Sequence, residues 1–242
     1  MKKYFIAMIF IPIVLQAHSL KERFQGAKPG DFVTCELNNS YNLLRIHENK
    51  GDTIVLEEIT FPSTLLKKGK IKKGVKGWQT WINGGADGHT SWILLELDLK
   101  EGRVVECFSF YRNAWLVLSE EDSFLLKLLT INLQPLPKER RRKIGPPPRE
   151  GFDTRRIWNP PLVFNGKTIS KPEFDTYEVN WPKDGTPLAA KRLEFYFDHS
   201  HPEFPFPYWG KVANAADAAY KFRVIDSGTG LETIQKEIPK KP

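Results

Sequence analysis

The chain is poor in cysteine and has only one long apolar run. Two cysteines in 242 residues are too few for a disulfide-dense scaffold. After residue 15, no stretch approaches the ~18 continuous apolar residues of a membrane-spanning helix, so we expect no such helix in the mature chain. The sequence also lacks G-x-S-x-G and H-E-x-x-H, so it carries neither common signature of a hydrolase active site.

The composition is that of a folded protein with a modest basic excess. Hydrophobic residues make up 40% of the chain, aromatic residues 12% and charged residues 27%, which excludes an intrinsically disordered protein. Lysine and arginine number 36 against 29 for aspartate and glutamate, a formal charge of +7. An excess of this size permits attraction to anionic lipids or glycans but specifies neither.

The N-terminus has the pattern of a secretory signal peptide. Two lysines precede the apolar run Tyr4–Leu15, and Ala17 and Ser19 are small residues at the spacing that signal peptidase requires. We expect residues 1–19 to be removed by a cut after Ser19, with a cut after Ala17 as the alternative. An uncleaved anchor is the competing interpretation, but the run would span only ~18 Å of a ~30 Å hydrocarbon core. Export to the periplasm or cell envelope argues against nucleic acid as a partner.

Most of the remaining chain is predicted to form β-strands. Alternating apolar and polar residues fill segments between residues 31 and 118 and again from residue 162. The strongest signals are two hairpins, over 43–60 and 92–111, and the turn dipeptide Asn165-Gly166. We predict a mainly β fold in which antiparallel hairpins form a curved sheet, a sandwich or a partial barrel.

Three segments interrupt the strand pattern. Residues 119–130 begin with a capping serine and carry an apolar stripe, which predicts one short α-helix. Residues 67–77 contain six lysines and are predicted as a polar loop or a twisted edge strand. Residues 135–161 are basic and rich in proline, as in an extended connector. This connector separates a β-rich domain, 20–134, from residues 162–242, which form either a second β-rich domain or the second half of the same sheet.

The two cysteines lie in predicted strands. Cys35 and Cys107 each share the apolar face of an alternating segment, so both are expected to point into a core. An oxidising compartment would allow them to form a disulfide. The alternative is a pair of buried free thiols that pack as small hydrophobic groups.

One loop contains the densest group of metal-ligand types. His199 and His201 alternate in an extended segment and would project to the same side, with Glu203 or Asp198 as a third ligand. Such a site would hold zinc and support hydrolysis. The alternative is a solvated loop at a strand end, and in that case no cofactor is expected.

Two further segments are candidate interaction surfaces. The basic run supplies side chains for contact with an anionic membrane, or else forms a solvated loop. Its members are Lys138, Arg140, Arg141, Arg142 and Lys143. The aromatic segment would present rings to an apolar ligand, or else close a core. Its members are Phe204, Phe206, Tyr208 and Trp209.

These observations favour binding over catalysis. A curved, aromatic-rich sheet can enclose an apolar ligand with apolar side chains alone. We therefore predict an exported envelope protein that binds or carries an apolar ligand or an envelope partner. The alternatives are a metal-dependent hydrolase built on His199 and His201, and a structural or adhesive module without a ligand. The sequence does not predict the oligomeric state.

Overall fold

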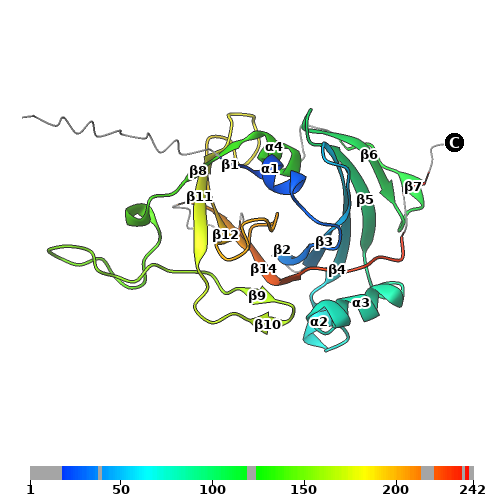
Figure 1. The fold of residues 1–242 in the computed structure, drawn as a ribbon, viewed down its shortest axis with the longest axis horizontal. Helices are drawn as coiled ribbons and strands as arrows, with labels where there is room; N and C mark the ends of the chain where they lie inside the picture. The colour runs from blue at the N-terminus through cyan, green and yellow to red at the C-terminus, as the bar shows by residue number, and fades with distance from the viewer. Residues whose placement is uncertain (1–17, 38–39, 119–123, 214–220, 236–237, 240–242) are drawn as a thin grey trace, which may run out of the picture.

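The computed structural model describes residues 18–37, 40–118, 124–213, 221–235 and 238–239, so the predicted signal residues 1–17 lie outside it. Twelve strands form one antiparallel sheet in the order β1-β8-β11-β12-β13-β14-β2-β3-β4-β5-β6-β7. Figure 1 shows that this sheet curls strongly around two short helices. The predicted mainly β fold with a curved sheet is confirmed. No helix among the described residues is long and apolar enough to cross a bilayer.

The first half of the chain supplies consecutive neighbours in the sheet. Its strands are β2 (Phe32–Leu37), β3 (Ser40–Asn49), β4 (Thr53–Pro62), β5 (Ser91–Asp98), β6 (Arg103–Ser109) and β7 (Ala114–Trp115). Both predicted hairpins are present, as the pairs β3–β4 and β5–β6. Strand β3 is longer than predicted because its pairing with β4 continues through a bulge between Ile46 and Glu48.

The second half continues the same sheet. Its strands are β8 (Asn132–Pro135), β11 (Phe174–Asn180), β12 (Arg192–Asp198), β13 (Trp209–Val212) and β14 (Lys221–Gly228), with β1 (His18–Ser19) paired to β8. Strand β14 pairs with β2, so strands from both halves lie in one sheet. Strands β9 (Val163–Phe164) and β10 (Lys167–Thr168) form a separate ribbon. Its turn residues Asn165 and Gly166 have φ of 49° and 75°, the left-handed values that a tight hairpin needs.

The helices are short and cover the sheet at defined places. They are α1 (Leu20–Gln25), α2 (Thr64–Lys67), α3 (Val75–Asn83) and α4 (Phe124–Thr130), with a 3₁₀ turn, η2, at Lys138–Arg140. Helix α4 lies within the predicted helix, whose residues 119–123 are outside the described part. The loop predicted over 67–77 is present only at residues 68–74, because α2 ends at Lys67 and α3 begins at Val75. The buried side chains Trp78, Trp81 and Ile82 have helical spacing and anchor α3 despite the surrounding lysines.

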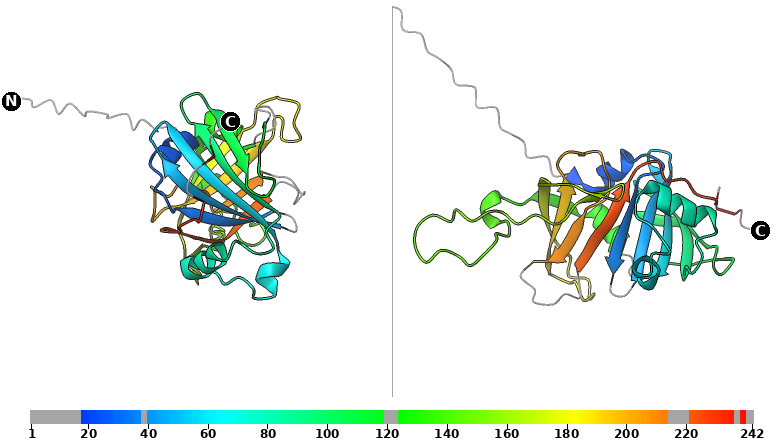
Figure 2. Two further views of the ribbon diagram at one scale, coloured as in Figure 1. Left: turned by 90° about the vertical axis from the view of Figure 1, so that its right-hand side faces the viewer. Right: turned by 90° about the horizontal axis from the view of Figure 1, so that it is seen from below.

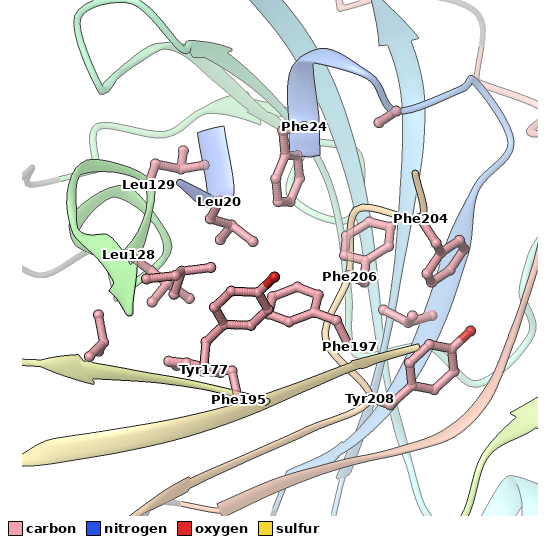
Figure 3. Close-up of a cluster of buried hydrophobic side chains, with 14 of the residues drawn as sticks. Leu20, Phe24, Leu128, Leu129, Tyr177, Phe195, Phe197, Phe204, Phe206 and Tyr208 are labelled. Carbon is pink, nitrogen blue, oxygen red and sulfur yellow. The ribbon is translucent and has the colours of Figure 1, made fainter. Parts of the chain in front are cut away.

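The two faces of the sheet bury separate groups of apolar side chains. On the inner face, side chains of α1 and α4 pack against rings from β11, β12 and the segment before β13, as Figure 3 shows. On the outer face, α3 packs over β4, where Phe61 lies 4.9 Å from Trp81 and 5.8 Å from Trp78 between ring centroids. Strand periodicity produces this division, since Ile54 and Leu56 point inward whereas Ile59 and Phe61 point outward.

The buried carboxylate of Asp226 joins three parts of the outer face. It is fully buried and accepts four N–H hydrogen bonds. The donors are the backbone of Gly74 at 2.6 Å, the indole of Trp78 at 2.7 Å, and the backbones of Gly166 at 2.9 Å and Ser227 at 3.0 Å. These bonds tie α3 and the β9–β10 turn to β14.

Between β8 and β11, part of the chain leaves the body of the protein. Figures 1 and 2 show the residues that follow η2 as a long projecting loop. Its two ends lie side by side, because Ile144 donates a backbone hydrogen bond to Arg156 and Trp158 donates one to Arg142.

We expect Asp226→Asn to lower the free energy of unfolding by about 3 kcal/mol. The amide keeps one acceptor oxygen but turns an NH₂ group toward N–H donors that have no water to replace the lost partner. Denaturant unfolding of both proteins measures the difference. The matched variant Asp87→Asn, at an exposed loop position, should change stability by less than about 0.5 kcal/mol. An equal effect of the two substitutions would contradict the role of Asp226.

Candidate functional site

The aromatic segment predicted to bind a ligand is part of the core. Phe204, Phe206, Tyr208 and Trp209 are only 4%, 4%, 1% and 6% exposed. Phe206 packs edge-on against Phe24 of α1 at 5.4 Å between ring centroids. The rings of Phe204, Phe206 and Tyr208 close the interior, while Trp209 packs on the opposite face against Trp158 at 5.3 Å between ring centroids. All four are buried and present no ligand surface, which corrects the prediction.

The predicted metal ligands do not converge. His199 Nδ1 lies 3.0 Å from a carboxylate oxygen of Asp175, and this hydrogen bond raises the histidine pKa. His201 Nδ1 instead lies 2.6 Å from Asp198. Glu203 is exposed to solvent. Within the described ranges, no group of three histidine, cysteine, aspartate or glutamate side chains is arranged to hold a metal ion.

The predicted disulfide is not formed. Cys35 on β2 and Cys107 on β6 are both free, and three strands separate them in the sheet. Neighbouring strands lie about 4.8 Å apart, so two residues separated by three intervening strands are too far apart for a disulfide, whose Cα atoms lie within about 7 Å. Both thiols face inward, so the predicted core-facing orientation does match their burial.

The basic run is largely engaged within the protein. Four of its five side chains contact other parts of the chain, while Lys138 is exposed. The partners are the carboxylate of Glu178 for Arg140, the backbone carbonyls of Leu136 and Phe174 for Arg141, the ring of Trp158 for Arg142, and the carboxylate of Asp153 for Lys143. Contact of this run with an anionic surface stays a prediction.

A different set of side chains gathers on the inner face of the sheet. Leu44, Glu58 and Ile93 are direct cross-strand neighbours on β3, β4 and β5. Cys35 and Asn42 face each other in the next row, on β2 and β3. All five side chains are only half-buried. We call these five residues the Glu58 seat.

Side chains on the same strands are more deeply buried toward the end of the sheet that helices α1 and α4 cover. Ile46, Leu56 and Leu95 point to the same face but are 0%, 1% and 7% exposed. Helix α1 is fixed at that end, because the side-chain amide of Asn49 donates to the backbone carbonyls of Phe24, Gln25 and Ala27. The helices therefore cover one end of the inner face, and solvent reaches the Glu58 seat farther along it.

Next to the seat, Phe222 on β14 adds an aromatic wall. Its ring occupies the space that a side chain at position 210 would need, since a Cβ on Gly210 would lie 2.1 Å from the ring. Glycine at this position of β13 lets the ring lie flat on the sheet. Phe222 is half-buried and packs against the ring of Phe195 at 6.2 Å between centroids.

Glu58 is the polar group of this apolar surface. Burial raises its pKa, while the hydroxyl of Thr60 partly opposes the shift. The amide of Asn42 donates a 2.8 Å hydrogen bond to it. Among the described residues, no lysine, arginine or histidine lies within ion-pair distance of Glu58. The fold therefore favours the neutral carboxyl group, which can both donate and accept a hydrogen bond.

The neighbouring Glu57 shows what a paired carboxylate looks like in this sheet. It points to the outer face and binds Arg45 at 2.7 Å, the indole of Trp92 at 2.8 Å and the hydroxyl of Thr233 at 2.6 Å. All of its partners come from the protein. Glu57 is therefore structural, whereas Glu58 leaves hydrogen-bonding capacity for a ligand.

The thiols near the seat are chemically quiet. Burial raises the pKa of Cys35 to about 12 and that of Cys107 to about 11, and the charge of Glu58 contributes in the same direction. A thiol with so high a pKa remains protonated and is a poor nucleophile. The site can bind through apolar contact and hydrogen bonds, and it offers no activated nucleophile.

Comparison with known proteins identifies a family but no activity. The model of a family described as CT021 protein matches residues 42–170, which include Asn42, Leu44, Glu58 and Ile93. A crystal structure of the hypothetical protein CT021 from Chlamydia trachomatis is similar, with a TM-score of 0.64 and 20% sequence identity. The alignment covers 93% of this chain and 98% of that one, and at this identity it shows a shared fold. No curated protein matches.

We expect Glu58→Gln to stabilise the protein at pH 7.5. The raised pKa means that the folded state holds its proton more tightly than the unfolded state, so the stability linked to Glu58 is full in acid and is lost as the pH rises through the folded-state pKa. Glutamine avoids this loss. Urea unfolding from pH 3.5 to pH 8 should show a gain that vanishes below the unfolded pKa of about 4.3. Glu101→Gln, an exposed turn position, should show no such gain.

Proposed function

The chain belongs to the CT021 protein family, and we propose that it is a non-enzymatic protein that binds an apolar ligand on the inner face of its sheet. One observation carries the proposal. The Glu58 seat joins half-buried apolar side chains to a single carboxyl group without a cationic partner among the described residues, on a face whose other end is filled by helices and rings. Ligand sites in proteins typically combine apolar walls with a few polar groups in this way.

The seat suggests the chemistry of its ligand. Leu44, Ile93 and Phe222 offer an aliphatic and aromatic surface, which suits an acyl chain or a ring system. Asn42 and the carboxyl group of Glu58 offer hydrogen bonds to one polar group of the ligand, such as a hydroxyl.

The alternatives have less support. A hydrolase built on His199 and His201 needs ligands that converge, and these two side chains bind different carboxylates. A module without a ligand would leave the half-exposed apolar side chains of the seat without a role. That second alternative is an outcome of the binding experiment below.

We further propose that the protein is exported and that signal peptidase cuts after Ala17 rather than after Ser19. Ser19 caps α1: its hydroxyl accepts the backbone N–H of Glu22 at 3.2 Å, and its own N–H donates to the Glu22 carboxylate at 3.3 Å. His18 and Ser19 also form β1, which pairs with β8. A cut after Ser19 would remove both features from the mature protein.

The first prediction of this proposal concerns the mature N-terminus. Intact-mass analysis of the exported protein should give a chain that begins at His18. In the mature protein, Ser19→Ala should lower the free energy of unfolding by about 1 kcal/mol, because the capping box loses its side-chain acceptor. A mature chain that begins at Leu20 would show that neither β1 nor the cap is retained.

The second prediction concerns the seat. The neutral fluorophore N-phenyl-1-naphthylamine should bind the mature protein saturably, and Ile93→Trp should weaken binding by about tenfold because the larger ring fills the seat. The matched variant Ile169→Trp, at a residue 42% exposed beside the β9–β10 ribbon, should bind as the wild type does. Thermal unfolding of both variants checks that the fold is kept.

Two results would count against a ligand seat. One is the absence of saturable binding together with a native mass spectrum that shows no co-purified small molecule, which would favour the structural module. The other is equal binding by the Ile93 and Ile169 variants, which would place the ligand elsewhere.

A further inference from the structure

The projecting loop is a shaped arm. We define the arm as residues 143–157. Its stem is closed by the bridge between Lys143 and Ile157. The Asp153 carboxylate binds Lys143 at 3.0 Å and Arg155 at 2.9 Å, and these contacts hold the aspartate pKa well below its usual range. Arg155 also donates a 2.6 Å hydrogen bond to the carbonyl of Gly145 across the loop.

Proline stiffens the outgoing side of the arm. The run Pro146-Pro147-Pro148 fixes three successive φ angles and favours an extended backbone. Together with the contacts of Asp153, it gives the arm a defined shape at a distance from the core. Figures 1 and 2 show the arm reaching away from the sheet in two perpendicular views.

The tip of the arm exposes a large apolar side chain. Phe152 is 97% exposed, and it follows Gly151, whose φ of 83° makes the turn. Exposing a whole phenyl ring to water is unfavourable, and within the described chain no packing partner compensates for it. The exposed ring is therefore available for contact with another molecule.

The arm carries a small basic excess. Residues 143–157 contain four lysines and arginines and two carboxylates, a net charge of +2. Arg149 lies three residues before Phe152, Arg156 lies at the stem opposite Ile144, and both are exposed. Among the described residues, neither has an ion-pair partner. Other cations of this region bind within the protein, to Glu178, Asp153 and the ring of Trp158.

We propose that the arm docks the protein on the surface of an anionic lipid bilayer, with Phe152 entering the boundary between head groups and acyl chains and with Arg149 and Arg156 facing phosphates. An exposed aromatic ring on an arm with a basic excess matches the polarity gradient of this interface. A protein groove would need a strip of apolar side chains along the arm, but the other exposed apolar residue, Ile144, lies at the stem. The inference does not depend on the Glu58 seat.

The test uses co-sedimentation of the mature protein with vesicles. Vesicles of phosphatidylcholine and phosphatidylglycerol in equal amounts should bind the wild type, and vesicles of phosphatidylcholine alone should not. Phe152→Ser should lower the partition coefficient by about tenfold, since the ring no longer leaves water. The double variant Arg149→Gln/Arg156→Gln should lower it by a similar factor, and about 500 mM salt should weaken wild-type binding.

Matched controls separate the arm from general stickiness and general charge. Val117→Ser removes another fully exposed apolar side chain, 100% exposed, and should leave binding unchanged. Lys70→Gln/Lys76→Gln removes two exposed charges beside α3 and should have little effect. Equal losses in the lysine and arginine variants, or no loss with Phe152→Ser, would overturn the proposal. Wild-type protein that fails to bind the anionic vesicles, or that binds both vesicle types equally, would also overturn it.

Insertion of the tip has its own readout. Phe152→Cys adds an exposed thiol, whereas the raised pKa values of Cys35 and Cys107 leave those thiols poorly reactive. A polarity-sensitive dye on the new thiol should brighten and shift to the blue on anionic vesicles. An unchanged spectrum with bound protein would overturn insertion of residue 152. Binding of N-phenyl-1-naphthylamine should be the same in all arm variants, so failure of the arm and failure of the seat are distinguishable.

Discussion

The arrangement of the outer face depends on one buried charge. Asp226 lies where the pairing of β14 with β2 shifts by one residue, and this bulge turns its carboxylate toward the outer face. Four N–H groups then satisfy a charge that would otherwise be costly to bury. Because β14 also joins the two halves of the sheet, the same short segment fixes α3, the β9–β10 turn and the continuity of the sheet.

Alternation along β4 separates structure from candidate function. Glu57 and Glu58 are adjacent, so one side chain must point outward and the other inward. The outward carboxylate meets Arg45 and becomes part of the scaffold. The inward one meets apolar neighbours and one amide, and burial favours its uncharged form. Two residues of one type therefore have different roles because their surroundings differ, and the seat is a consequence of the curvature that leaves this part of the inner face partly open to solvent.

Sequence signals that span a few residues predicted the turns and hairpins correctly. They were less informative for segments whose structure depends on contacts between residues distant in sequence. The Asn165-Gly166 turn and the two long hairpins follow from backbone preferences within a few residues, so the sequence predicts them correctly. Helix α3 was missed because the charged residues around it outnumber the three side chains that anchor it. The aromatic segment could equally have formed a surface or a core, and only its contact with α1 decides for the core. The alternation of β4 places Glu58 on the inner face together with Ile54 and Leu56, and this could be read from the sequence. The missing cationic partner could not, because the neighbours of Glu58 come from strands distant in sequence.

The connector between β8 and β11 is longer than its task requires. These strands pair directly, with Pro135 opposite Tyr177, so the chain returns to the place that it left. A turn of two to five residues could close such a pair. Residues 136–173 therefore serve some purpose other than spanning a distance between domains. The β9–β10 ribbon within them is accounted for by its bond to Asp226.

The arm makes no comparable contact with the body beyond its stem, although prolines and ion pairs give it a fixed shape. A rigid segment loses less conformational entropy when it binds an external surface, because it is already ordered before contact. A shaped, basic excursion with an exposed ring at its tip is therefore better explained by an encounter outside the protein than by the needs of the fold.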